Sequence, residues 1–514
     1  MHHVSLIIEF LRGRPKVVFW FVALSQGVLW TLIPTLFFSS PPGDVPLVLA
    51  VGREFMLGSY LGPPLAFWLA EIAFRVAGVF GLYALSQICI VVALWAVFTL
   101  GRSVIGTRHA VLAILLMVGI AAFTVPSPDF GPAVLAIPFW ALALLHYWRA
   151  FGEGKRGSWF LLSVDLGLLL LTHFAGIVLV VLLIVFAPLT RRGRAALGYP
   201  EPWLALLLLA VVVAPYAAWL SQSWPLVAAA LQENTEGVSA LRLVGALVAV
   251  HLGLLLLAAL STGIGRGRNE RAPEIDRSPV EPAARAFVYF FALTPALVVI
   301  ALVLIGERVP QATLLSAFGS LTTWSALAPL ALLSGMAVVL AAGNRVLIYR
   351  EQLVSSSWLA LLVAPPLLLA ASLLVVPWTF ARDNRLAQPS ADEAEFFAET
   401  YQRRTGQPLQ YVSGDARLAP LIAMMVPGGA QNRPHVFFAW APQRSPWVSV
   451  DDVAANGGVL VWPAAANNAV PEDLRTQFPD LVPELPRQFD RAVQGRLPPI
   501  RIGWAVLRPP AQPQ

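Results

Sequence analysis

The stretch VFGLYALSQICIVVALWAVFTL at residues 79–100 contains no charged side chain. A membrane-spanning helix needs about 20 predominantly apolar residues, so this stretch predicts such a helix. The whole chain has the same character, because 57% of its 514 residues are hydrophobic and 12% are charged. In an ordinary globular protein, about 45–50% of the residues are hydrophobic and about 25% are charged. A soluble protein with this composition would have too few charged residues to cover its surface. We therefore predict a polytopic α-helical membrane protein.

Charge is unevenly distributed along the chain. Residues 1–378 hold 22 of the 35 Lys and Arg and 16 of the 29 Asp and Glu, so they carry the whole net charge of +6. No basic stripe with interleaved aromatic residues occurs, and we predict no nucleic-acid partner. The single cysteine, Cys89, excludes an intrachain disulfide and a cysteine metal site.

About eleven apolar runs are expected to cross the membrane. The first follows Arg12, Arg14 and Lys16 and is too long for a signal peptide, so we place the N-terminus in the cytoplasm. The odd number places the C-terminal part on the opposite side. The predicted spans are residues 17–37, 79–100, 109–123, 131–148, 158–171, 174–188, 202–221, 241–261, 286–306, 322–343 and 356–378.

Arginines in alternate loops support this topology. They gather at residues 102–108, 149–156, 191–194, 266–277 and 345–350, all on the cytoplasmic side under this assignment. The stretch 158–188 has basic loops at both ends, so it must form two short spans with an outer turn near Thr172 and His173.

Two regions are not predicted to face lipid. Residues 39–78 mix charged residues and prolines with apolar ones, which predicts an outer loop with interfacial helices. Residues 379–514 have a soluble composition, with strand-like runs at 408–414, 435–440, 458–463 and 501–508 between helix-like segments. We therefore divide the chain into a transmembrane domain, 1–378, and a periplasmic α/β domain, 379–514.

Two carboxylates stand out at the outer face. Asp44 lies in the first outer loop, and Asp129 lies in the sequence SPDFGP before the fourth span. Because the topology places both on one side of the membrane, we expect them to converge on one cavity at its surface. Ionisable residues in or beside spans are commonly functional, so both acids are candidate functional residues.

The residues around these acids resemble a known family. Asp44 after the first span, Tyr60-Leu61-Gly62-Pro63-Pro64-Leu65 and Ser127-Pro128-Asp129 are similar to an acidic residue, a Y-x-x-P-P-L stretch and a (T/S)-P-D loop. These features belong to GT-C membrane glycosyltransferases of the protein O-mannosyltransferase and lipid A aminoarabinose transferase type. Arg53-Glu54-Phe55-Met56 resembles the family's R-E-M. The paired short spans and the C-terminal outer domain fit the family's layout.

The sequence departs from this family at three positions, one of which is His173-Phe174 after the fifth span, where the family often has Lys-Tyr or a similar pair. Val45 follows Asp44 where the family commonly has Asp-Glu. Leu61 and Gly62 precede the proline pair, where the family often has an acidic residue that binds metal or substrate. No cofactor is predicted; a divalent metal is left open, but its usual acidic position is missing.

The resemblance implies transfer of a sugar from a polyprenyl-phosphate carrier to an acceptor at the periplasmic face of a bacterial inner membrane. The acceptor would be a lipid A or lipopolysaccharide component, or another lipid or glycan of the cell envelope. Inverting transfer needs a base for the acceptor hydroxyl, for which Asp44 is the candidate. The resemblance thus implies that Asp44 and Asp129 are catalytic and that substrate is bound by Arg53, Glu54, Tyr60 and His173.

Each of these residues also has a structural interpretation. Asp44 and Asp129 are suited to helix N-caps, Arg53 and Glu54 to an ion pair, and His173 to a helical turn. Glu71 and Arg75 have the spacing of a helix-surface salt bridge, and Asp165 within a short span requires a partner.

Two other functions are kept open. The chain would be a flippase or transporter of a lipid-linked sugar if charged residues lined a path at mid-membrane. It would be a catalytically degenerate binding subunit if the departures from the family's motifs abolish turnover.

Overall fold

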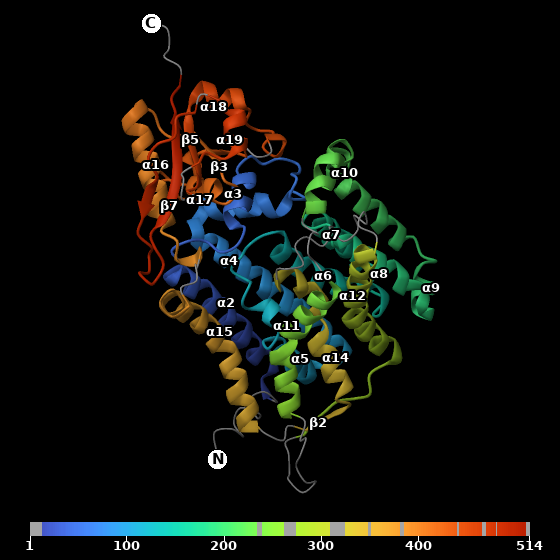
Figure 1. Cartoon of the computed structure of the whole chain (residues 1–514). Coiled ribbons are helices and arrows are strands. Elements are labelled where there is room, and N and C mark those ends of the chain that lie inside the picture. Colours follow the sequence, from blue (N-terminus) through green and yellow to red (C-terminus); the bar gives the residue numbers. More distant parts are fainter. Residues whose placement is uncertain are drawn as a thin grey trace.

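The computed structural model describes residues 13–233, 239–261, 274–308, 324–347, 351–380, 385–438, 442–464, 469–479 and 481–509. A long helical region carries a small α/β region at one end. Figure 1 shows β5, β7 and α16 at that end and β2 at the opposite end.

Among the described residues, seven helices are long and apolar enough to cross a membrane. They are α2 (Pro15–Phe37), α4 (Leu65–Val104), α6 (Pro132–Phe151), α10 (Glu201–Glu233), α11 (Ala240–Ser261), α12 (Pro282–Arg308) and α15 (Glu351–Thr379). The shorter apolar helices are α5 (Thr107–Met117), α7 (Ser158–Leu170), α8 (Gly176–Leu189) and the interrupted series η3 (Trp324–Leu327), α13 (Ala328–Ala331) and α14 (Ser334–Ala341). Every predicted span coincides with one of these segments. The predicted class of multi-pass helical membrane protein is confirmed, and the number of eleven crossings stays a prediction.

The long helix α4 is two helices joined by a kink. Ala77 and Gly78 leave the helical conformation, and Gly78 has φ +59°, a value that glycine adopts readily. The sequence predicted a loop with interfacial helices up to residue 78 and a span from residue 79, and the kink lies at this boundary. The first segment of α4, residues 65–76, and α3 (Val45–Gly52) are the two helices of the predicted outer loop.

Helix α6 lies at the centre of the helical region. In α6, 83% of the most apolar 18-residue stretch is buried, whereas 17–39% of the corresponding stretch is buried in the other six long helices. Those six therefore present apolar side chains outward, as lipid-facing helices do. Aromatic rings from α6, α8 and α12 pack together, with Tyr147, Phe186 and Phe287 among them.

Two loops that were both predicted to be cytoplasmic meet in a short antiparallel pair. Strand β1 (Glu274–Asp276) pairs with β2 (Arg345–Leu347), with Ile275 opposite Val346. The pairing supports the prediction that these arginine-rich loops share one side. It does not tell which side is the cytoplasm, which stays a prediction.

The C-terminal region contains a five-stranded sheet in the order β4-β3-β5-β7-β6. Its strands are β3 (Tyr411–Gly414), β4 (His435–Phe437), β5 (Gly458–Pro463), β6 (Arg487–Phe489) and β7 (Ile500–Leu507). Its helices are α16 (Ser390–Thr405), α17 (Leu418–Met425), α18 (Val450–Asn456) and α19 (Glu472–Gln477). β3 is parallel to β4 and β5, and β7 is antiparallel to β5 and β6. The predicted α/β class is confirmed; β6 was not predicted because its three residues carry no strand pattern.

Backbone hydrogen bonds join this region to the end of α2. The amides of Ser39 and Ser40 donate to Leu386 O at 2.9 and 3.1 Å, and Ser390 Oγ donates to Ser39 O at 3.0 Å. A second attachment lies at the end of α15, where the amide of Arg496 donates to Pro377 O at 3.0 Å. The α/β region is therefore held at both α2 and α15.

Asp165 has the partner that its position in a short span required. His146 Nδ1 on α6 lies 2.5 Å from Asp165 Oδ2 on α7, and both side chains are about nine-tenths buried. The pair joins α6 to α7 inside the helical bundle.

Replacing His146 with leucine should destabilise the protein, because it leaves Asp165 buried without this partner. Leaving a buried polar group without its hydrogen-bond partner costs about 1–3 kcal/mol, and more for a charged group, whereas replacing both partners by apolar residues can be nearly neutral. Denaturant unfolding in detergent should therefore show a clearly lower free energy of unfolding for His146→Leu. The double variant His146→Leu/Asp165→Leu should recover most of that free energy. Lys155→Gln, at the exposed pair with Glu153, is the control. Equal stability of His146→Leu and this control would contradict the interpretation.

Candidate active site

Asp44 and Asp129 meet in the structure, although 85 residues separate them. The backbone amide of Asp44 donates to Asp129 Oδ1 at 3.3 Å. Gly43, with φ +54°, allows this approach, since a Cβ there would lie 2.0 Å from Asp129 Oδ2. The expectation that the two predicted catalytic residues converge agrees with this geometry, whereas their catalytic roles stay a prediction.

Neither carboxylate serves as a helix cap within the described residues. Asp44 occupies the N-cap position of α3, but its side chain accepts no capping hydrogen bond. The N-cap of α6 is Gly131, and Asp129 lies two residues before it. The capping interpretation is therefore wrong for both residues.

Two glutamines in membrane helices hold the loop that carries Asp129. Gln87 Nε2 on α4 donates to Ser127 Oγ at 2.8 Å, and Ser127 Oγ donates to Thr124 O at 2.6 Å. Gln26 Nε2 on α2 donates to Phe123 O at 2.8 Å. The sequence analysis missed both glutamines, although buried amides in apolar spans are a signal of interhelical hydrogen bonds.

The surroundings of Asp129 favour its neutral form. Burial, the largest cause, and the nearby charge of Asp44 raise the pKa of Asp129 to about 7, although the hydrogen bond from the Asp44 amide opposes the rise. A carboxylate with a pKa near neutrality can take up and release a proton at physiological pH.

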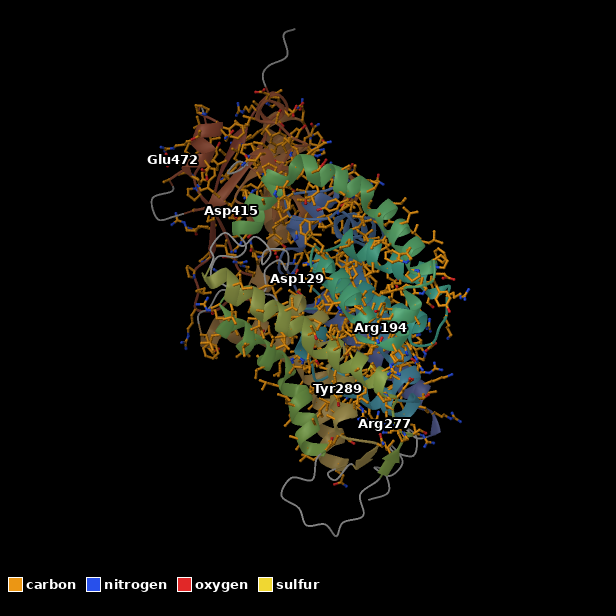
Figure 2. All side chains as sticks on the ribbon, turned by 90° about the vertical axis from the view of Figure 1, so that its right-hand side faces the viewer. Asp129, Arg194, Arg277, Tyr289, Asp415 and Glu472 are labelled. Carbon is orange, nitrogen blue, oxygen red and sulfur yellow. The ribbon has the colours of Figure 1, made fainter. Side chains whose placement is uncertain are left out.

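Asp129 also lines a cavity of about 330 Å³, within the usual range for ligand pockets. The cavity lies where the end of α2, α15, η3 and the Asp129 loop come together. Apart from Asp129 and Ser325, its lining is apolar: Phe38, Pro42, Val125, Pro126, Pro128, Leu369 and Leu386. Figure 2 shows Asp129 between Asp415 of the α/β region and Arg277 near the opposite end.

Arg53 and Glu54 are engaged with the C-terminal region. Arg53 Nη2 donates to His435 Nε2 at 3.3 Å, and His435 Nδ1 donates to Glu54 Oε1 at 2.7 Å. Arg53 Nε lies 3.9 Å from Glu54 Oε1, which is the ion pair of the structural interpretation. Within the described residues, the buried Arg53 Nη1 has no hydrogen-bond partner. Neither residue lines the cavity, and their substrate-binding role stays a prediction.

Tyr60 packs against the C-terminal region as well. Its ring lies edge-on to Phe438 with centroids 6.0 Å apart, and the Arg444 guanidinium lies 4.9 Å above it. Beyond it, Leu65 at the start of α4 donates its amide to Leu171 O at 3.0 Å. The Pro63–Pro64 turn therefore lies beside the turn between α7 and α8.

His173 forms part of that turn. Its Nδ1 accepts the amide of Ala175 at 3.0 Å, and burial lowers the pKa of His173 to about 4. His173 is therefore neutral at pH 7 and supplies no positive charge there. This agrees with the structural interpretation as a satisfied polar group, and the substrate-binding role of His173 stays a prediction.

The predicted pair of Glu71 and Arg75 is present, with Arg75 Nε 2.7 Å from Glu71 Oε1. Glu71 also binds Arg433 of the C-terminal region, a contact that the sequence analysis missed. In the described part of the chain, no group of three or more His, Cys, Asp or Glu residues is arranged to hold a metal ion. Asp44 and Asp129 alone are a sparse donor set, and we derive no metal-dependent step.

Comparison with known families gives a match over part of the chain. Residues 62–219 match the family described as dolichyl-phosphate-mannose-protein mannosyltransferase. The resemblance predicted from the sequence is confirmed. The matched stretch begins just before the proline pair and contains Asp129, the two short helices α7 and α8, and most of α10.

The fold is similar to two kinds of solved structure. ArnT from Cupriavidus metallidurans in the apo state has 13% identity and a TM-score of 0.45, with 97% of this chain and 99% of that chain covered. The archaeal oligosaccharyltransferase AglB from Archaeoglobus fulgidus has 14% identity and a TM-score of 0.44, with 88% and 70% covered. Comparison with curated proteins finds no match.

Replacing Gly43 with alanine should displace the Asp129 carboxylate from the Asp44 amide. The charge of Asp44 raises the pKa of Asp129 more than the amide hydrogen bond lowers it, so separating the two acids should lower this pKa. Carbodiimide labelling of the protonated carboxyl, mapped by mass spectrometry across pH, measures the change. Gly154→Ala is the matched control, since Gly154 also has positive φ but a Cβ there meets no atom within 4 Å. An unchanged labelling midpoint in Gly43→Ala would contradict the geometry.

Proposed function

We propose that this protein transfers a sugar from a polyprenyl-phosphate carrier to an acceptor hydroxyl of the cell envelope. The reaction takes place at the periplasmic face of a bacterial inner membrane, and the acceptor is a lipid A or lipopolysaccharide component or another envelope glycan. One observation carries the proposal: two carboxylates meet beside an apolar cavity at the end of membrane helices. The family match to residues 62–219 supports sugar transfer as the reaction.

Sugar transfer requires a base and a leaving group. The acceptor oxygen attacks the anomeric carbon, the bond from that carbon to the phosphate oxygen breaks, and polyprenyl phosphate leaves with the bonding electrons. The acceptor's proton passes to the base. An efficient base has a pKa near the working pH, and the pKa of about 7 makes Asp129 suited to this role.

Asp44 acts as the electrostatic partner of Asp129 in this proposal, although the sequence suggested Asp44 as the base. Asp44 is exposed, whereas Asp129 is the carboxylate that lines the cavity. The negative charge of Asp44 raises the proton affinity of Asp129, and its amide orients the carboxylate. A carboxylate held in one orientation meets its substrate without further ordering.

The apolar cavity walls accommodate hydrocarbon, which a polyprenyl carrier or a lipid acceptor supplies. Negative charge develops on the departing phosphate and needs a cation or hydrogen-bond donors. Arg53 is the proposed group, because its buried Nη1 has no partner among the described residues. Buried donors of this kind are usually hydrogen-bonded. Glu54 and Tyr60 contact the C-terminal region near Arg53 and are proposed to shape the same site.

Replacing Asp129 with asparagine should lower kcat about 100- to 10,000-fold, the usual contribution of a general base. The assay supplies synthetic polyprenyl-phosphate-linked hexose or pentose donors with envelope lipids and detects transfer by mass spectrometry. Asp451→Asn, an exposed carboxylate of α18, is the control. Retained activity in Asp44→Asn/Asp129→Asn, with normal expression, would refute these assignments. Donor translocation or binding without turnover in the native protein would instead favour a flippase or a binding subunit.

The pH dependence of kcat/KM gives a second prediction. Only ionised Asp129 can act as a base, so kcat/KM should rise with pH through about 7. Asp44→Asn removes a negative charge that raises the pKa of Asp129, so the rise should move to lower pH. A midpoint that stays in place or moves upward in Asp44→Asn would contradict the proposed electrostatic role.

A further inference from the structure

Arg433 of the C-terminal region is buried in an ion pair with Glu71 of α4. The two side chains are 3% and 0% exposed, and Arg433 Nη2 binds Glu71 Oε2. Arg433 Nε donates to Ala430 O at 3.1 Å, and Arg75 holds the other oxygen of Glu71. The buried Glu71 carboxylate is thus bound by two arginines, Arg75 and Arg433, that are 358 residues apart in the sequence.

The Arg433 guanidinium also lies 4.6 Å above the ring of Phe74. Placing a charge in such a buried position is costly unless its partners are well oriented. Arg433 therefore has little freedom to shift without breaking both the ion pair and the ring contact. The first segment of α4 is fixed to the C-terminal region at this point.

Phe74 belongs to an apolar cluster that reaches both catalytic candidates. We call it the outer cluster; it contains Val45, which follows Asp44, and Phe130, which follows Asp129. Its buried members are Val45, Val48, Leu49, Val51, Ala66, Phe67, Ala70, Phe74, Leu82, Cys89, Phe130, Val134, Leu135 and Met424. The outer cluster therefore connects Arg433 with both acids by continuous packing.

Close contacts hold α3 inside the outer cluster. A Cβ at Gly52 would lie 2.3 Å from Phe67 O on α4, and a Cβ at Gly131 would lie 3.8 Å from Val48 Cγ2. α3 is thus packed between the first segment of α4 and the start of α6. Because Asp44 begins α3 and Asp129 precedes α6, the position of α3 sets the distance between them.

We propose that Arg433 is a positioning residue of the active site, which acts through Glu71 and Phe74 to hold α3 so that Asp44 stays against Asp129. The inference rests on the proposed function and extends it, because it gives the C-terminal α/β region a part in the same site. His435 provides a second attachment just beyond α3, through Arg53 and Glu54. Arg433 therefore acts on the orientation of the carboxylates and touches neither of them.

The first test is hydrogen exchange in the full-length protein in detergent. Arg433→Gln should speed exchange of the α3 amides by about tenfold or more, because local opening replaces the fixed contact. Arg433→Gln/Glu71→Gln puts two neutral amides in place of the ion pair and keeps the region folded if Arg433→Gln alone does not fold. Arg192→Gln, at the exposed pair with Glu281 on another part of the chain, should leave α3 exchange unchanged.

The second test is kinetic and separates positioning from folding. Arg433→Gln should lower kcat about 10- to 100-fold, the cost of misplacing reacting groups by about 1 Å. KM for the donor should stay within about twofold. The rise of kcat/KM with pH should move to lower pH, as in Asp44→Asn. A merely structural role would reduce the amount of folded enzyme but leave the pH profile of the remaining enzyme in place.

The outcomes are distinguishable. Unchanged α3 exchange in folded Arg433→Gln would overturn the inference, and so would faster exchange with unchanged kcat and pH profile. If the native protein transfers no sugar from any donor, the proposed function fails. In that case the α3 exchange, together with the carbodiimide labelling midpoint of Asp129, still decides whether Arg433 positions the two acids.

Discussion

A carboxylate can be kept out of water only where its surroundings compensate for the lost hydration. Asp129 meets this condition in part, because the amide of Asp44 donates to it while burial and the charge of Asp44 raise its pKa to about 7. The loop geometry serves this balance. Gly43 leaves room for the carboxylate, and Gln87 holds Ser127 in the loop before it. The proposed base depends on this one approach of two acids, and the outer cluster holds α3 beside it.

The outer loop lies between the membrane helices and the C-terminal region, and both contribute contacts that fix its shape. The membrane helices supply Gln26 and Gln87, while the C-terminal region supplies Arg433 and His435. Asp44 immediately precedes α3, and α3 contacts both the membrane helices and the C-terminal region. Neither of these two parts alone therefore determines the position of Asp44. The attachments of the α/β region at α2, α15 and α4 together fix its position beside the outer loop.

The sequence predicted those features that depend on local composition. Charge-free runs located the membrane helices, the mixed stretch up to residue 78 ends at the Gly78 kink, and strand-like runs between helix-like segments predicted four of the strands. The acids of the site were found because charge is scarce in the membrane part. The interruption of residues 324–341 into η3, α13 and α14 was not predicted, because its composition is uniformly apolar.

Contacts between distant parts of the chain could not be predicted. Glu71 and Arg433 are 362 residues apart, and Glu54 and His435 are 381 apart, with no spacing pattern to connect them. The resemblance to the family's R-E-M predicts a substrate-binding role for Arg53 and Glu54 and gives no sign of a contact with the C-terminal region. In the structure, the C-terminal region takes up part of their hydrogen-bonding capacity. The Asp44–Asp129 approach was expected only because both loops had been placed on one face.

The most direct test of the central claim is a structure of the protein with a bound polyprenyl-phosphate-linked sugar and an acceptor analogue. If Asp129 is the base, the acceptor oxygen lies within hydrogen-bond distance of its carboxylate, about 2.6–3.2 Å, with hydrocarbon in the cavity beside Phe38 and Leu369. A sugar bound away from both Asp44 and Asp129, with the cavity empty, would contradict it.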